Sequence, residues 1–410
     1  MTDADLPALV RQEGGRVLAT LIRLTGDMAM AEDAVQDAVV RALERWPHDG
    51  IPANPAAWLT TVARNRALDL IRREADRTRK ESAAVLLDQV VNRMAEPLSD
   101  SVVRDDQLRL LFTCCHPALA PDARVALTLR TLCGLSTVEI ARLFLVEDAT
   151  MGQRISRAKK KIETARIPYR VPADHELPDR LPAVLATVYA VVTAGHHAPE
   201  GEQHDRADLA REGVRLARLL HELMPDEPEC AGLRALSLAT YARRDARVDA
   251  AGEVVLLAHQ DRRRWHVDEI EEADRVLQRA LTRRRPGPYQ VQAAIACLHG
   301  MAESFEATDW PQIASLYAEL ERLAPSPVVR VNRAVAVAEV EGTEVALALL
   351  ADVEADLARW HLFWSTKAEM LARLGRVAEA VEAFEAALGC SPNDSDRRHL
   401  QRRVAEVSRQ

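Results

Sequence analysis

The basic side chains between residues 149 and 166 have the chemistry expected of a nucleic-acid contact. This stretch carries six Lys or Arg side chains against one carboxylate, Glu163. Cationic side chains at this density bind phosphates, and amide or guanidinium groups among them can pair with base edges. A second basic cluster lies earlier in the chain, at Arg64, Arg66, Arg72, Arg73, Arg77, Arg79 and Lys80.

The net charge of the whole chain hides this asymmetry. The 410 residues carry a formal charge of −8 at pH 7, which argues weakly against a nucleic-acid partner. Residues 1–170 contain 25 basic and 23 acidic side chains, a balance of +2, so residues 171–410 carry −10. This distribution indicates a nucleic-acid-binding part joined to an acidic part of different function.

The elements that must position these side chains are helices. Ala, Leu, Val, Arg and Glu dominate, and no convincing alternating strand pattern occurs. We expect a first helix over residues 6–24 and a second from the cap Asp27 to just before Pro47. A third helix, capped by Asn54, is expected to reach about residue 73 and to carry the earlier basic cluster.

The later basic run belongs to a predicted helix-turn-helix. Residues 105–112 and 121–132 are expected to form two helices. The capping box Ser136-x-x-Glu139 then begins a short helix, and Asp148 is expected to cap the long basic one. Two helices joined by so short a turn, the second strongly basic, are typical of a helix-turn-helix.

The C-terminal part contains an internal repeat. From His361 to Asp394, large and small residues follow the spacing of a tetratricopeptide unit, although Lys367 replaces the usual leucine. Gly342 and Ala346 precede matching positions by 33 and 34 residues, which suggests a degenerate preceding copy. Because such arrays need several stacked units, we expect the helices before residue 328 to continue the superhelix. The matching positions are Trp364, Ala368, Gly375, Ala380, Phe384, Ala387 and Pro392.

Several classes of protein are disfavoured. The acidic N-terminus does not resemble a signal peptide, no apolar run reaches membrane-spanning length, and six cysteines without a CxxC pair suit a reducing compartment. We therefore expect a cytoplasmic protein with no membrane partner. No Gly-rich phosphate loop, nucleophile elbow or paired carboxylates occur, so neither enzymatic activity nor a cofactor is expected.

Three other groups of polar or metal-binding residues have simpler explanations than a functional site. The Cys-Cys-His sequence at 114–116 lacks the further ligands that a zinc site needs, so core packing is favoured. The histidines at 196, 197 and 204 indicate a polar surface loop. The sequence Asp-Arg-Arg-Arg-Trp at 261–265 would suit an exposed interaction site, but a ridge between stacked helices is more common. No metal site is predicted.

Four short motifs in the first 165 residues resemble those of a known family. Their order and spacing resemble an extracytoplasmic-function (group IV) RNA polymerase sigma factor, in the branch with a tetratricopeptide-like C-terminal extension. The resemblance implies two partners, core RNA polymerase and promoter DNA. The motifs are Ala31-Glu32-Asp33-Ala34-Val35-Gln36-Asp37, Trp58-Leu59 with Val62-Ala63-Arg64-Asn65-Arg66-Ala67-Leu68-Asp69, Glu139-Ile140-Ala141, and Arg154-Ile155-Ser156-Arg157-Ala158-Lys159.

The resemblance assigns the outer face of the second helix to the clamp helices of core polymerase. Gln36, Asp37 and Arg41 match that surface, and Val40 beside them suits a partner contact. From the pattern alone, a solvated amphipathic face is the alternative.

The third helix matches the element that grips and melts the −10 promoter region. Its arginines are implied to hold phosphates, and Asn65 to hydrogen-bond a flipped-out base of the single strand. Residues 47–57 would wall the pocket for that base. For any single arginine, an ordinary surface charge remains the alternative. The predicted −10 contacts are Arg64, Asn65, Arg66, Asp69, Arg72 and Arg73.

The basic helix after Asp148 matches the reader of the −35 element in duplex DNA. Gln153 and Arg157 are expected to contact base edges, while Arg154 and the lysines at 159–161 bind phosphates or point back to the domain. Leu145 stands where the family often has a turn glycine, and Gly152 where it often has a basic residue. The predicted −35 contacts are Thr150, Gln153, Arg154, Arg157 and Lys160.

Together these patterns predict an all-α chain of four parts. They are sigma domain 2 at 1–75, a linker at 76–104, sigma domain 4 with the helix-turn-helix at 105–168, and a regulatory helical repeat domain at 169–410. The predicted function is that of an alternative sigma factor modulated by its own C-terminal domain, whose repeats are also candidates for a peptide or protein partner. The alternative is a DNA-tethered tetratricopeptide adaptor, and a third hypothesis is an array that senses a small molecule.

Overall fold

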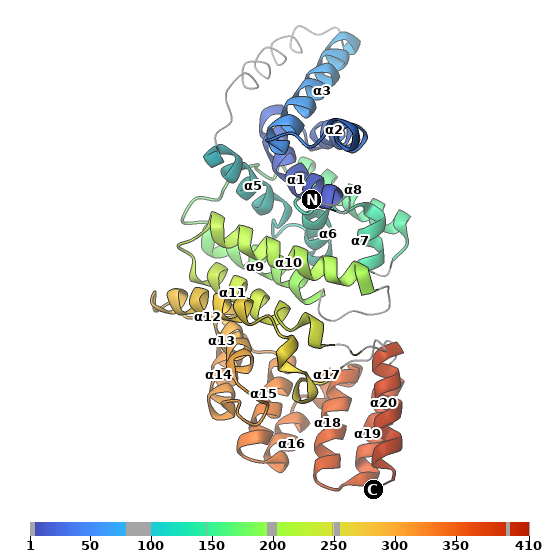
Figure 1. Ribbon diagram of the computed structural model, residues 1–410, viewed down its shortest axis with the longest axis vertical. Coiled ribbons are helices and arrows are strands. Elements are labelled where there is room, and N and C mark those ends of the chain that lie inside the picture. Colours follow the sequence, from blue (N-terminus) through green and yellow to red (C-terminus); the bar gives the residue numbers. More distant parts are fainter. Residues whose placement is uncertain are drawn as a thin grey trace. The chain divides into compact units, whose positions relative to one another are not determined.

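The structure is a computed structural model that describes residues 5–78, 100–144, 146–194, 203–247, 249, 255–390 and 394–409. Within these ranges the regular structure is helical and no strand occurs, as the sequence predicts. The chain divides into two compact units, residues 1–194 and 195–410 (Figure 1). No helix of the described residues is both long and apolar enough to span a membrane.

The first unit begins with a bundle of three helices. They are α1 (Asp5–Thr25), α2 (Met28–Asp49) and α3 (Pro55–Thr78) (Figure 1). Both predicted caps are confirmed. The Asp27 carboxylate accepts hydrogen bonds from two backbone amides of the first turn of α2, at 2.8 and 3.0 Å. The side-chain oxygen of Asn54 accepts from the amide of Ala57 at 3.0 Å.

The predicted end of α2 before Pro47 is wrong. The helix continues to Asp49 and is capped by Gly50, whose amide donates to the carbonyl of Trp46 and whose φ is +83°. A proline in the last turn removes one helical hydrogen bond, which is a smaller loss than in the helix interior. The buried Trp46 also anchors this turn, since its ring packs edge-on against Trp58 of α3 at 5.3 Å.

A second bundle contains the predicted helix-turn-helix. The capping box of α7 (Thr137–Leu143) is confirmed, because Ser136 and Glu139 exchange reciprocal side-chain to backbone hydrogen bonds of 2.6 and 3.2 Å. Asp148 does not cap the basic helix, which begins at Asp148 itself after Glu147, and the Glu147 side chain makes no capping bond. The bundle consists of α5 (Asp100–Cys114), α6 (Pro121–Thr131), α7 (Thr137–Leu143), α8 (Asp148–Thr164) and α9 (Leu177–Ala194).

Helix α9 lies in the first unit, beyond the domain boundary expected at residue 168. It packs against α5 and α6. Arg180 on α9 donates to the carbonyl of Phe112 at 2.9 Å, and α9 buries an apolar face. The buried apolar residues of α9 are Leu181, Val184, Leu185, Val188, Val191 and Val192. Most of the expected linker, residues 79–99, lies outside the described residues.

The C-terminal half of helix α1 is largely buried and joins the two bundles. It packs against α2 and α3 on one side and against α5 on the other. Six consecutive residues of α1, 17–22, are all buried, and a run of this length is buried on every side of a helix only when protein surrounds it. The buried side chains are Val17, Leu18, Ala19, Thr20, Leu21, Ile22 and Leu24.

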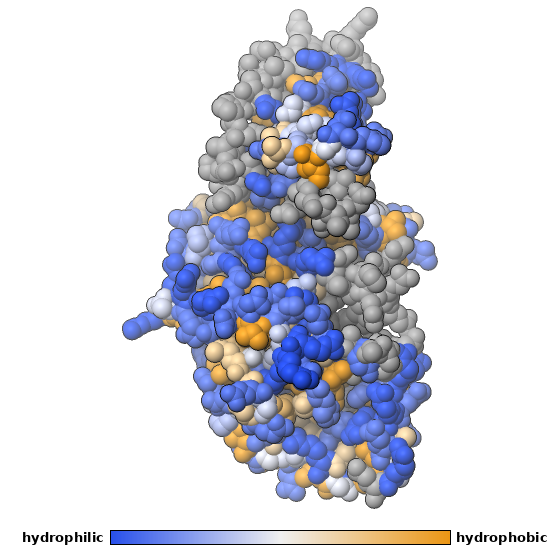
Figure 2. All heavy atoms as spheres, in the orientation of Figure 1, coloured by the Kyte–Doolittle hydropathy of each residue, from blue (hydrophilic) through white to orange (hydrophobic). Residues whose placement is uncertain are grey.

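The second unit consists of helices that pack in succession, each against its neighbours in the chain and, as with α11 (Pro228–Tyr241) and α13 (Pro288–Met301), against the next helix but one. Its core lies between these helices, and on the visible face hydrophobic residues form only small, separate patches among hydrophilic ones (Figure 2). The helices are α10 (Gln203–Leu223), α11 (Pro228–Tyr241), α12 (Val267–Leu281), α13 (Pro288–Met301), α14 (Trp310–Leu323), α15 (Pro327–Val340), α16 (Thr343–Ala351), α17 (Glu354–Leu357), α18 (His361–Arg373), α19 (Val377–Gly389) and α20 (Asp394–Val407).

The predicted repeat positions behave alike in the two copies. Gly342 before α16 and Gly375 before α19 both have positive φ, at +101° and +71°. Ala346 and Ala380, which follow them, are both fully buried. Of the other predicted positions, Phe384 is fully buried between helices, whereas Pro392 lies outside the described residues.

Ion pairs between successive helix pairs repeat with the same period. Arg373 of α18 donates to Glu339 of α15 at 2.6 Å, and Arg403 of α20 donates to Glu369 of α18 at 2.7 Å. Each pair joins residues 34 positions apart. Helix α20 therefore takes the place of the first helix of a further unit, which supports the tetratricopeptide-like assignment.

The Asp-Arg-Arg-Arg-Trp sequence divides between the two readings, because Trp265 and Arg262 pack against helices while Asp261, Arg263 and Arg264 are exposed. Trp265 is only 5% exposed, and the guanidinium of Arg262 lies 4.4 Å from the centre of its ring. Arg262 also donates to the carbonyls of His299 and Ala302, at 2.7 and 2.6 Å. This arginine therefore caps the C-terminal end of α13, where carbonyl groups lack helical partners.

Candidate nucleic-acid interface

Four of the predicted −35 residues form one exposed stripe on α8. Thr150, Gln153, Arg157 and Lys160 are exposed, and spacings of three or four residues place them on the same side of a helix. The side chains facing the second bundle are buried. They are Met151, Ile155 and Ala158.

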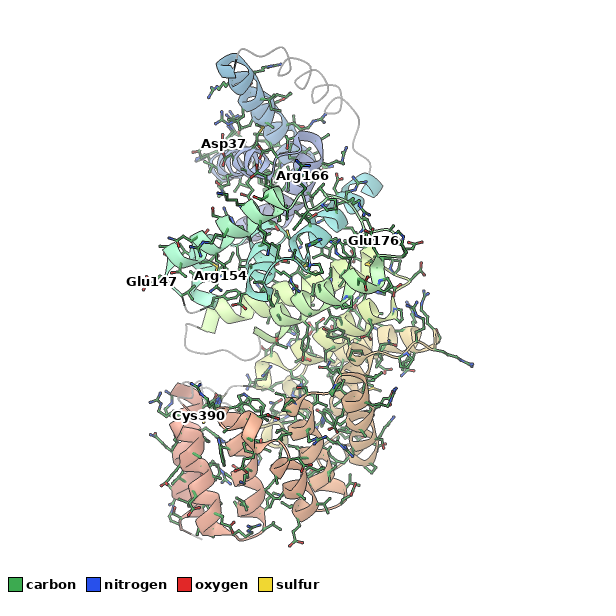
Figure 3. The ribbon with its side chains drawn as sticks, turned by 180° about the vertical axis from the view of Figure 1, so that it is seen from behind. Asp37, Glu147, Arg154, Arg166, Glu176 and Cys390 are labelled. Atoms are coloured by element: carbon green, nitrogen blue, oxygen red, sulfur yellow. The ribbon has the colours of Figure 1, made fainter. Side chains whose placement is uncertain are left out.

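The fifth residue, Arg154, turns toward its own bundle (Figure 3). It is partly buried, its guanidinium lies 5.6 Å from the centre of the Phe144 ring, and it pairs with Asp122 of α6 at 3.5 Å. The sequence left two roles open for Arg154, phosphate binding or a contact within its own domain, and the structure favours the contact within the domain.

Leu145 and Gly152 are the two positions at which this chain departs from the family pattern. Leu145 lies outside the described residues, so its backbone geometry is not described. A Cβ added at Gly152 would meet only the Thr137 methyl group, at 3.9 Å. There is therefore space on α8 for a side chain at position 152.

Some of the predicted −10 residues of α3 are exposed, and others contact neighbouring helices of the first bundle. Asn65, Asp69, Arg72 and Arg73 are exposed, although Arg72 lies 3.9 Å from Asp69. The other two are held against the rest of the first bundle. Arg64 is partly buried, and burial, with a smaller effect of the nearby positive charge of Arg23, lowers its pKa. Arg66 forms an ion pair with Asp37 of α2.

The predicted polymerase-facing residues share one side of α2. Gln36, Val40 and Arg41 are exposed. Asp37, labelled in Figure 3, is partly exposed and pairs with Arg66. Val40 is 52% exposed, and Leu43, which sequence reasoning missed, is 41% exposed three residues later. Two exposed apolar side chains on an otherwise polar face suit a protein contact.

The structure also joins residues that the sequence gave no reason to connect. Lys159 of α8 forms an ion pair with Glu32 of α2, 127 positions away in the chain. The Tyr169 hydroxyl donates to the carbonyl of Ala19 in α1 at 2.7 Å, and burial raises the pKa of this tyrosine. No signal in a single sequence pairs such distant residues.

A buried carboxylate lies at the same junction. Asp106 of α5 is fully buried and pairs with Arg23 of α1 at 2.9 Å and with Arg109 at 3.0 Å. Burial raises the pKa of Asp106, although both arginines act in the opposite direction. A buried carboxylate paired across two elements fixes their relative position, since removing one partner leaves the other charge unpaired.

The two cysteines of the Cys-Cys-His sequence pack in the core of the second bundle, whereas His116 is partly exposed. The Cys114 thiol lies 3.3 Å from the Thr131 hydroxyl, and Cys115 lies 3.6 Å from that of Thr128. His116 Nδ1 accepts from the amide of Ala118. In the described part of the chain, no three His, Cys, Asp or Glu side chains group as metal ligands would. Residues 196 and 197, and the side chain at 204, lie outside it.

Comparisons with known proteins agree with this arrangement. Residues 9–77 match the model of sigma-70 region 2, residues 109–162 match that of sigma-70 region 4, and residues 180–281 match a family of unknown function, DUF6596. No solved structure gave a significant match.

Relatives cover the chain to different extents. An uncharacterized protein of Rhizobium meliloti is 43% identical over 395 residues, which is 96% of this chain and 93% of that protein. The ECF RNA polymerase sigma factor SigJ of Mycobacterium tuberculosis is 34% identical over 48% of this chain and 65% of its own length. The probable ECF sigma factor SigI of the same species is 32% identical over 38% of this chain and 54% of its own.

The helix-turn-helix, the three-helix bundle and these matches define a DNA-binding transcription initiation protein. The chain belongs to the extracytoplasmic-function RNA polymerase sigma factors, in the branch with a helical C-terminal extension. Membership of this family implies a non-enzymatic role in transcription initiation.

Proposed function

We propose that the chain directs core RNA polymerase to a particular class of promoter through three surfaces. Helix α2 binds core polymerase, α3 binds the single-stranded −10 element, and α8 reads the −35 duplex. We assign these surfaces to the two proposed sigma domains, 1–75 and 105–168, and place α9 with the second of them. The repeat unit modulates the activity.

The exposed stripe of Thr150, Gln153, Arg157 and Lys160 on α8 is the observation that carries this proposal. Its helix is anchored by three buried residues, so the stripe is presented on a fixed support. Glutamine and arginine can form paired hydrogen bonds with adenine and guanine, whereas lysine binds phosphate as a point charge.

Substitutions in this stripe test how the −35 element is read. Gln153→Ala and Arg157→Ala should each lose discrimination at a defined −35 position, at a cost of about 1–3 kcal/mol for each lost base contact. Lys160→Ala is the matched control and should weaken all promoters alike. Binding to a set of single-base promoter variants measures both effects. Uniform weakening by all three substitutions would contradict the assignment to base reading.

Co-purification and run-off transcription test the polymerase surface. Val40→Glu places a charge in the exposed apolar pair of α2 and should reduce binding to core polymerase. Val267→Glu, the same change at an exposed valine of α12, is the matched surface control. A wild-type chain that neither co-purifies with core polymerase nor supports transcription would favour the DNA-tethered adaptor.

The acidic second unit supports the proposal of modulation, since it could mask basic DNA-binding surfaces. A chain that ends at Ala194 removes this unit and keeps the whole first unit. Its transcription and core binding should differ from those of the full chain. If both stay unchanged, the second unit does not modulate the activity.

A further inference from the structure

The second unit contains a group of buried nitrogen atoms that form no hydrogen bond with any described residue. They are Nε of Arg243, Nη2 of Arg262, Nε1 of Trp265 and Nδ1 of His299. Their side chains come from three separate segments, which are the turn after α11, the segment before α12 and the last turn of α13. Because buried polar atoms in proteins are nearly always hydrogen-bonded, four of them in one region need an explanation.

The four side chains lie beside one another. The guanidinium carbons of Arg262 and Arg243 are 4.4 and 5.7 Å from the centre of the Trp265 ring, and Trp265 is only 5% exposed. Arg262 donates through Nη1 to the backbone carbonyl of His299 at 2.7 Å, which holds the guanidinium in place and leaves Nη2 without a partner. The four nitrogen atoms therefore belong to one site, which we call the arginine–tryptophan site.

The arginine–tryptophan site carries a positive charge that no described carboxylate balances. Arg243 forms no ion pair with a described residue, and burial, followed by the positive charges of two neighbouring arginines, lowers its pKa to about 10. Burial also lowers the pKa of Arg262, against a smaller opposite effect of Glu306. By contrast, the adjacent Arg244 pairs with Glu269 at 2.6 Å. Since a buried charge without a partner is costly, a bound anion would supply what the site lacks.

The number of charges and donors favours a phosphate group over a carboxylate. A phosphate group carries close to two negative charges at pH 7 and has three terminal oxygens that accept hydrogen bonds, whereas a carboxylate has one charge and two oxygens. Guanidinium groups bind both kinds of anion. Here two guanidinium groups, an indole N–H and an imidazole that donates in one tautomer approach from three segments, which matches three oxygens better than two.

The exposure of the site limits the size of the ligand. The four nitrogen atoms are buried, so a rigid rod such as duplex DNA cannot reach them, while the partly exposed Arg243 and His299 connect the site to the surface. We propose that the arginine–tryptophan site binds the phosphate group of a small molecule. This inference goes beyond the proposed sigma function and does not depend on it.

Thermal unfolding of the full-length protein in inorganic phosphate tests the proposal. Four of the six tryptophans lie within residues 195–410, so tryptophan fluorescence reports mainly on the second unit. At constant ionic strength, phosphate should raise the Tm along a saturating curve, by about 3 °C at roughly ten times its Kd. A wild-type Tm that shows no saturable increase with phosphate would overturn the proposal.

Two arginines provide a matched pair of variants. Arg243→Met removes the unbalanced charge and its donors, and should raise the Kd for phosphate about tenfold or more. Arg263→Met is the same change at a side chain that is 90% exposed and pairs with Asp261, and it should keep the wild-type Kd. Phosphate also stabilises proteins by exclusion from their surface, and this effect acts alike on both variants. Equal responses of the two variants would therefore rule out a specific site.

A third variant guards against a folding defect in Arg243→Met. Trp265→Phe keeps a buried aromatic ring beside both guanidinium groups and removes the unpartnered indole N–H. It should raise the Kd for phosphate several-fold, because one donor is lost. If Arg243→Met does not fold, an unchanged Kd in Trp265→Phe contradicts the proposal.

Two further ligands identify the chemistry that the site prefers. Inorganic phosphate and glycerol 3-phosphate share the phosphate group, and the lower of their two Kd values shows whether the free ion or a monoester is the better ligand. Succinate at the same ionic strength carries two carboxylates and should bind several-fold more weakly than both. Tighter binding of succinate would overturn the assignment to a phosphate group.

Discussion

At the scale of single residues, the chain buries several ionisable groups whose environment decides their charge. His299 of α13 shows this most clearly. Its ring packs edge-on against Trp310 at 5.2 Å, and Arg262 donates to its backbone carbonyl. Burial, followed by the positive charges of Arg243 and Arg262, lowers the pKa of His299 to about 4.

This lowered pKa predicts how the stability of the second unit depends on pH. An unfolded histidine takes up a proton near pH 6.5, whereas the folded one resists protonation down to about pH 4. The contribution of His299 is therefore complete above pH 6.5 and is lost as the pH falls toward 4, by about 3 kcal/mol at most.

Chemical denaturation of the wild type and of His299→Gln at several pH values measures this effect. The difference in unfolding free energy between the two proteins should shrink steadily from pH 7 to pH 4. A difference that is constant over this range would show that His299 does not resist protonation.

At the scale of elements, helix ends are determined by local chemistry that a sequence can show. Asp27, Asn54 and the Ser136–Glu139 capping box all act as expected. Two predicted helix ends were wrong for local reasons. Pro47 lies in the last turn of α2, which tolerates a proline, and α8 begins at Asp148 after Glu147, which does not cap it. The glycines in the turns of the repeats, Gly342 and Gly375, also have a local role, because their positive φ ends one helix before the next begins.

Two glycines near α19 give a matched prediction about these turns. Gly375 has a φ of +71°, which a side chain strains, while Gly389 at the end of the helix has no such φ, and no atom lies within 4 Å of an added Cβ at either position. Gly375→Ala should lower the unfolding free energy by about 1–2 kcal/mol. Gly389→Ala should change it by less than about 1 kcal/mol, in the stabilising direction.

Thermal or denaturant unfolding of the two variants checks this difference. Equal effects of the two substitutions would show that the backbone at Gly375 is not constrained by the turn between α18 and α19.

At the scale of the whole molecule, the first unit is larger than its two sigma regions. The matches to sigma-70 regions 2 and 4 end at residue 162, whereas the compact unit ends at Ala194. Helix α9 makes the difference, since it packs against α5 and α6 and buries an apolar face. The DUF6596 match, residues 180–281, therefore begins inside this unit.

Truncation on either side of α9 tests this organisation. A chain ending at Ala194 should unfold cooperatively and stay soluble, because its core is complete. A chain ending at residue 176 loses α9, exposes the apolar surfaces of α5 and α6, and should be less stable by several kcal/mol or aggregate. Circular dichroism and size-exclusion chromatography compare the two, and equal stability would show that α9 is not part of the first unit's core.

The sequence by itself determined the local features of this protein. Helix periodicity, caps, the basic stripe of α8 and the 34-residue repeat all depend on residues within one or two turns or one repeat, so their spacing is visible in the chain. Only the tertiary structure decided which distant residues meet. Arg154 pairs with Asp122, Lys159 with Glu32, and Tyr169 with the backbone of Ala19. Such contacts depend on how whole helices pack, and one sequence carries no local signal for that.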